Sequence, residues 1–82
     1  MYPSVINVKP LKNYKLMLTF DTNEVKVFDM KPFLDQGVFK PLNDESLFNS
    51  VHVSFDTVEW SNGADICPET LYEQSVKFED CA

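Results

Sequence analysis

Two side chains of this sequence could carry nucleophilic or acid–base chemistry at neutral pH, His52 and Cys67. Histidine is the side chain whose unperturbed pKa lies near neutrality, and a cysteine at the start of a helix gains thiolate character. No oxyanion donor and no orienting third group can be named for a pair of these residues. His52 falls on the polar phase of an expected strand, and Cys67 falls where a helix cap is expected. We therefore predict an exposed histidine, a structural cysteine and a protein that is not an enzyme.

Metal and cofactor sites need donor side chains at a regular spacing. One histidine and two cysteines that lie fourteen positions apart do not form a zinc site. Asp65 and Glu69 could share a cation with Asp56 or Glu59, but the segment lacks the ligand spacing and the central glycine of a calcium loop. Both glycines of the chain have turn explanations, so no phosphate-binding loop is present. The sequence therefore predicts no metal and no cofactor.

The segment 60–72 combines aromatic, acidic and turn-forming residues more densely than any other part of the chain. Each position has a structural explanation: the Asn-Gly pair favours a hairpin turn, and a proline suits the first position of a helix. A functional interpretation places four residues on one surface that grips a protein partner: Trp60, Asp65, Glu69 and Tyr72. We favour the structural interpretation, because it accounts for the whole segment, and we keep these four residues as a candidate interaction surface.

The charge is distributed unevenly along the chain. Seven lysines, no arginine and thirteen acidic residues give a net charge of −6. The first forty residues carry six lysines and four acids, a balance of +2, whereas the remainder has one lysine and nine acids, a balance of −8. Nucleic-acid binding usually requires a basic face rich in arginine, and an anionic membrane repels an acidic chain. The composition therefore predicts no direct nucleic-acid or membrane binding. The acidic half could meet a small basic protein as partner, but a solvated surface is the favoured explanation of its charge.

The length of 82 residues fits a single domain. We expect an ordered core over residues 3–76 and an acidic tail over residues 77–82. The N-terminus lacks a cationic stretch followed by an apolar one, and no apolar stretch is long enough for a membrane span. Two cysteines are too few for a disulfide framework. These features predict a cytoplasmic protein.

Strand patterns dominate both ends of the chain. Alternating apolar residues predict strands at 5–8, 14–20 and 25–28, which form an antiparallel meander. Val51, Val53 and Phe55 alternate with polar residues and predict a fourth strand with these three side chains buried. A C-terminal hairpin is expected next, with strands at 58–60 and 64–66 around the Asn-Gly pair, where both central residues need positive φ.

Short helices are expected in the middle and after the hairpin. A brief turn follows Asp29 and stops at Gly37, and Asn43 looks like the cap of a helix over residues 44–49. A second helix begins at Pro68 and buries Leu71, Tyr72 and Val76. The predicted fold is α+β: a small antiparallel sheet, made of a meander and a C-terminal hairpin, with one or two short helices on one face.

The pattern Trp-x-Asn-Gly-x-Asp-Ile-x-Pro-Glu-x-Leu-Tyr at 60–72 resembles the C-terminal signature of a large bacterial family, domain of unknown function 2442. Upstream matches include Leu16-x-Leu18-x-Phe20. The resemblance implies a fold similar to the N-terminal domain of a nitrifying bacterium's protein. It also implies a gene placed beside that of another small protein, as in toxin–antitoxin pairs. The family brings no established catalytic or ligand-binding residues.

Three functional interpretations follow from these features. The first is a protein-interaction module, one member of a toxin–antitoxin-like gene pair, because the acidic half of the chain suits a basic partner. The second is an accessory domain in transcriptional regulation that acts through a DNA-binding partner. An enzyme of unfamiliar type is the third and least supported. A homodimer formed through exposed sheet edges stays open.

Overall fold

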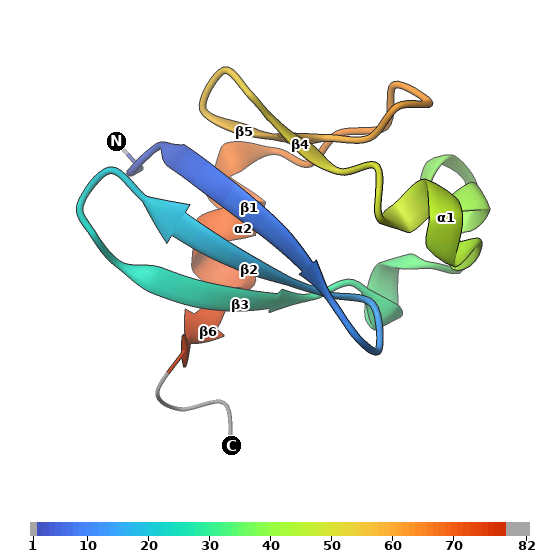
Figure 1. The fold of residues 1–82 in the computed structure, drawn as a ribbon, viewed down its shortest axis with the longest axis horizontal. Helices are drawn as coiled ribbons and strands as arrows, with labels where there is room; N and C mark the ends of the chain where they lie inside the picture. Colours follow the sequence, from blue (N-terminus) through green and yellow to red (C-terminus); the bar gives the residue numbers. More distant parts are fainter. Residues whose placement is uncertain (1, 79–82) are drawn as a thin grey trace.

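The computed structural model describes residues 2–78, which form two antiparallel sheets joined by short helices (Figure 1). The larger sheet has the strand order β1-β2-β3-β6, and the smaller one pairs β4 with β5. The strands are β1 (Val5–Leu11), β2 (Lys15–Phe20), β3 (Val25–Asp29), β4 (His52–Ser54), β5 (Thr57–Glu59) and β6 (Val76–Lys77). The helices are α1 (Glu45–Phe48), α2 (Pro68–Gln74) and the 3-10 helices η1 (Lys31–Phe33) and η2 (Gly37–Asn43). The predicted α+β class, with a small antiparallel sheet and short helices, is confirmed.

The predicted meander forms strands β1, β2 and β3 of the larger sheet. β2 alternates as expected: Leu16 and Leu18 are fully buried, and Phe20 is 1% exposed. β1 is longer than predicted, because the strand continues through Pro10, which pairs with Leu16. β1 is the edge strand of this sheet, where the missing N–H of a proline leaves no partner unpaired.

The Asn-Gly loop at 61–63 closes a hairpin turn, but with a different geometry from the one expected. Trp60 N–H donates to the carbonyl oxygen of Ala64 at 2.8 Å, and Gly63 N–H donates to that of Trp60 at 2.9 Å. Only Gly63 has positive φ, at 90°, whereas the prediction required it at both central residues. A left-handed third residue is typical of three-residue hairpin loops. The turn after β2 has the same design, with Asn23 at φ 71°.

The connection between the two sheets departs from the prediction in its caps. Gly37 does not stop a turn but begins η2. The cap of α1 is Asp44 and not Asn43, because the carboxylate of Asp44 accepts the backbone N–H two residues further on at 3.0 Å. The Asn43 amide instead donates to the carbonyl oxygens of Leu34 and Lys40, at 3.1 and 2.9 Å. Asn43 therefore fastens the two 3-10 helices together.

Helix α2 begins at Pro68 and buries Leu71, as predicted. Val76 is 49% exposed, so the expectation that it packs on the buried side of the helix is wrong. The helix ends at Gln74, two residues before Val76. The chain then becomes extended and pairs with β3 as strand β6. Lys77, which was expected in the acidic tail, belongs to this strand, and residues 79–82 of that tail lie outside the described residues.

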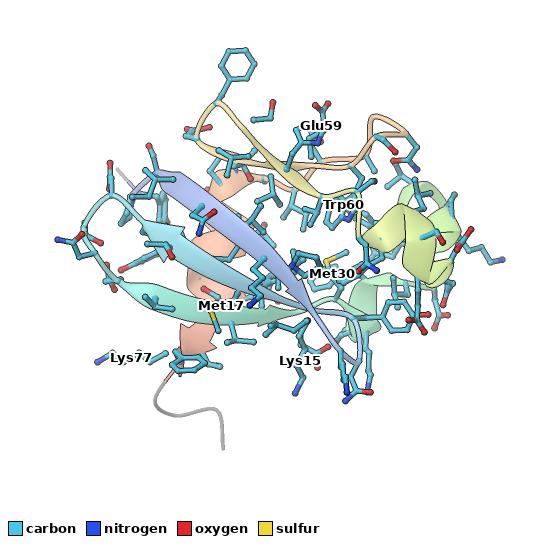
Figure 2. All side chains as sticks on the ribbon, in the orientation of Figure 1. Lys15, Met17, Met30, Glu59, Trp60 and Lys77 are labelled. Atoms are coloured by element: carbon cyan, nitrogen blue, oxygen red, sulfur yellow. The ribbon has the colours of Figure 1, made fainter. Side chains whose placement is uncertain are left out.

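The core fills the space between the larger sheet, α2 and the β4–β5 hairpin. Figure 2 shows Trp60 and Met30 in this space, where they are 1% and 0% exposed. The indole N–H of Trp60 donates to the carbonyl oxygen of Phe48 at 2.9 Å, so the only polar group of this buried side chain is satisfied. The other large, fully buried side chains are Phe20, Phe28, Phe48, Leu16, Leu18, Leu42 and Leu71.

Candidate functional site

The β4–β5 hairpin has one face in the core and one face toward solvent. In its register His52 lies opposite Glu59, and Val53 lies opposite Val58. Val58 is fully buried and Trp60 is 1% exposed, so Glu59 between them points outward, as strand alternation requires. His52 is exposed on this outer face, as predicted.

Acidic side chains gather on the outer face of the hairpin. Asp65 forms an isolated antiparallel bridge with Glu59, which places the two side chains on the same side. Like charges directly opposite each other destabilise a sheet, so packing does not explain this pair. His52 Nε2 lies 3.4 Å from Glu59 Oε1 and offsets part of the repulsion when the imidazole is protonated. The predicted return strand at 64–66 contributes only this one bridge to the sheet.

A shallow hollow of about 520 Å³ lies beside this pair of carboxylates. Its lining comes from the hairpin and from the approach to α2: Ser54, Phe55, Asp56, Thr57, Glu59, Asp65, Ile66, Cys67 and Pro68. Three of these residues are acidic, and none of the described residues that line it is a lysine. The surface can therefore attract a positively charged group. Cys67 is exposed at the cap position of α2, without a side-chain capping hydrogen bond.

Phe55 is 99% exposed at the tip of the hairpin, although the sequence pattern predicted it in the core. The strand ends at Ser54, and Phe55 and Asp56 form the loop that joins it to Thr57. The expected turn was one residue later, and this shift moves the ring from the buried phase to the loop. Phe55 has φ 56°, a left-handed conformation that is rare for a bulky residue.

The four residues of the predicted interaction surface do not lie together. Trp60 is buried in the core, so its assignment to a surface is wrong. Asp65 is exposed and lines the hollow, whereas Glu69 is exposed in the first turn of α2. Tyr72 is half-buried against the larger sheet, where its ring meets Phe20 edge-on at 5.1 Å between centroids. Only Asp65 of the four belongs to the acidic hollow.

Tyr72 instead fastens α2 to the sheet. Its hydroxyl donates to Glu24 at 2.9 Å, and the Lys26 ammonium lies 3.9 Å from its ring centroid and donates to its carbonyl oxygen. The hydrogen bond to Glu24 is the main cause that raises the pKa of Tyr72. Next to it, the hydrogen bond between Tyr2 and Glu73 is the main cause that raises the pKa of Tyr2 to about 12. These groups connect the helix to the larger sheet and to the N-terminal segment.

The carboxylate of Glu24 makes stability depend on pH at the acidic end. Hydrogen bonds from Thr22 and then Tyr72 lower its pKa below the usual 4.5. A depressed pKa contributes stability that is present above the unfolded value and is lost as the pH falls through the folded value. We expect Glu24→Gln to lower stability at neutral pH and to flatten its decline below pH 4.5. Urea unfolding over a pH series measures this. The exposed Asp35→Asn is the control, and equal slopes for wild type and Glu24→Gln would contradict the prediction.

Two further hollows among the described residues contain lysines as well as acids. One of about 130 Å³ is lined by Lys12, Lys31 and Glu45 among others, and one of about 420 Å³ by Lys26, Lys77 and Glu24 among others. Within residues 2–78, no three histidine, cysteine or carboxylate side chains come close enough to hold a metal ion. In the same range, no helix has the length and apolar character needed to cross a bilayer.

The fold and the surface define a small α+β domain with an acidic, aromatic-tipped hairpin. The family described as Protein of unknown function (DUF2442) matches residues 5–77, and the chain belongs to this family. No curated protein and no solved structure matches the chain. The predicted likeness to the N-terminal domain of a nitrifying bacterium's protein therefore stays a prediction.

Proposed function

We propose that this protein is a non-catalytic interaction module that binds a small basic protein through the outer face of the β4–β5 hairpin. The observation that supports the proposal is the single-sign hollow, where Asp56, Glu59 and Asp65 meet without a lysine in the described lining. Complementary charge steers association and selects partners. Figure 2 places Lys15 and Lys77 on the side of the molecule away from Glu59, so these two lysines do not neutralise this face.

The opposed pair of Glu59 and Asp65 gives the proposal a second support. The two residues face each other across a bridge, which costs stability in the free protein. A basic side chain of a partner that binds between the two carboxylates removes this repulsion. The gene arrangement that the family resemblance implies makes the product of the neighbouring gene the first candidate partner, as in a toxin–antitoxin pair.

A pull-down at low salt with two matched double variants tests the proposed function. Glu59→Gln with Asp65→Asn removes two charges from the hollow. Asp35→Asn with Glu45→Gln removes two exposed charges elsewhere. We expect wild type and the second variant to retain the same basic protein, and the first variant to bind the purified partner about tenfold more weakly.

The dissociation constants of the purified pair, measured by calorimetry, decide the result. Equal affinity for both double variants would show that another face binds the partner. The absence of any retained protein at low salt would remove the interaction proposal. A partner whose complex shifts DNA would assign the module to transcriptional regulation.

A further inference from the structure

We infer that Phe55 anchors this interaction by inserting its ring into an apolar pocket on the basic partner. The inference rests on the proposed function and adds the chemistry of the partner: a pocket for one aromatic ring, bordered by lysine or arginine side chains. Aromatic residues are enriched at the buried centres of protein interfaces, and a few such residues carry most of the binding energy.

The exposure of Phe55 separates it from the other apolar residues on the surface. Its side chain is 99% exposed, whereas Val38 and Ile6 are 61% and 57% exposed among the described residues. A ring that makes almost no contact within the chain contributes nothing to the core. Its whole apolar surface is available for burial against another molecule.

The loop that presents Phe55 is held by hydrogen bonds of the two residues that follow it. The Val5 N–H of β1 donates to the carbonyl oxygen of Asp56 at 3.2 Å. The Thr57 hydroxyl donates to the carbonyl oxygen of Ile66 at 2.6 Å. These bonds tie the hairpin tip to β1 and to the approach of α2. Less backbone freedom is lost on binding when the loop that carries the ring is held in place beforehand.

The fold has no need for an aromatic residue at this position. Position 55 is the first residue of a two-residue hairpin loop with φ 56°, and hairpin loops that need positive φ there favour glycine. Glycine at this position would relieve the strain and lose no packing. The phenylalanine is thus explained by a contact outside the chain.

Charge favours a basic protein as the partner over a second copy of this chain that presents the same face. The carboxylate of Asp56 follows the ring directly, and those of Glu59 and Asp65 lie across the adjoining hollow. The net charge of −6 makes two copies repel each other at this face. Burial of the ring would also exclude water from the charge pairs around it, which strengthens them.

Site-specific photocrosslinking tests the inference in the full-length protein. A photoreactive benzoyl-phenylalanine replaces Phe55 in one variant and Val38 of η2, which is 61% exposed, in the control. Both variants are irradiated in a lysate of the native host at low salt. The protein that crosslinks is then purified for binding measurements. We expect position 55, and not position 38, to capture a basic protein. Phe55→Ala and Phe55→Gly should then weaken its binding about thirtyfold, while Val38→Ala leaves binding unchanged.

The outcomes separate this inference from the proposed function. The inference is overturned, and the proposed function stays in place, if a basic partner binds the Glu59→Gln, Asp65→Asn variant more weakly but binds Phe55→Gly normally and does not crosslink at position 55. A crosslink to a second copy of the chain also overturns it. If no partner is retained at all, both fail. The thermal midpoint of Phe55→Gly should not lie below that of wild type, which shows that lost binding is not lost folding.

Discussion

Replacement of Trp60 by alanine is expected to lower the free energy of unfolding by about 3–5 kcal/mol, the largest effect of any single substitution considered. The indole is 1% exposed and packs beside the rings of Phe48 and Phe39, at 6.2 and 6.4 Å between centroids. A domain of this size has a total stability of roughly 4–12 kcal/mol. Urea denaturation followed by circular dichroism at far-ultraviolet wavelengths measures the loss.

The conservative variant Trp60→Phe separates the hydrogen bond of the indole from its volume. It keeps most of the apolar contact and removes only the indole donor to the carbonyl oxygen of Phe48. That oxygen still accepts the Val51 N–H at 3.3 Å, so the lost hydrogen bond should cost about 0.5–1.5 kcal/mol. Val38→Ala, on an exposed side chain, should change stability by less than about 0.5 kcal/mol. A loss for Trp60→Ala no greater than that of Val38→Ala would contradict the central place of the indole in the core.

The regular parts of the fold could be predicted from the sequence because their side chains alternate over enough residues. In β2, three apolar residues on one face fix the register, since a shift by one would expose all of them. Short or edge elements lack this constraint. Pro10 suggested a strand end, yet the edge position of β1 tolerates it. Val76 continued the apolar pattern of a helix, but pairing with β3 competed with the helix and prevailed.

The candidate site was predictable only in part, because exposure depends on where a turn falls. Asp65 could be identified as an exposed acid next to a turn, and it lines the hollow. Trp60 is buried, as the favoured structural interpretation of segment 60–72 implies. The alternative placed it on a surface, because an aromatic residue in a dense motif suits a core and an interface equally well. Phe55 was missed because the alternation Val51, Val53, Phe55 suggested burial, while the strand ended one residue before it.

The two faces of the hairpin allow binding and stability to be changed independently. The inward residues Val58 and Trp60 are at most 1% exposed and belong to the core. Phe55 is 99% exposed and has no packing to lose, and the side chain of Glu59, which is 35% exposed, points away from the core. Substitutions at the outward positions should therefore alter association without unfolding the protein, which makes the binding experiments interpretable.

Replacement of Leu71 by alanine is expected to lower the free energy of unfolding by about 2–5 kcal/mol. Leu71 is fully buried and is the only buried residue of the seven-residue helix α2. A helix of this length is not stable by itself in water, so it depends on contacts with the rest of the domain. Tyr72 supplies the remaining anchorage through Glu24 and Lys26. Urea denaturation of the variant measures the loss, with the exposed Gln74→Ala as the control, expected within about 0.5 kcal/mol of wild type.

Amide hydrogen exchange shows whether this loss is shared by the whole domain. Lys26 of β3 donates to the carbonyl oxygen of Tyr72, and β3 pairs with β6 directly after the helix. Because both contacts connect α2 to the larger sheet, we expect Leu71→Ala to lower the protection of α2 and of the meander strands together. Loss of protection in α2 alone, with β1 to β3 unchanged, would show instead that the helix unfolds as a separate unit. In that case the approach to the acidic hollow, which includes Pro68, would open without unfolding the sheet.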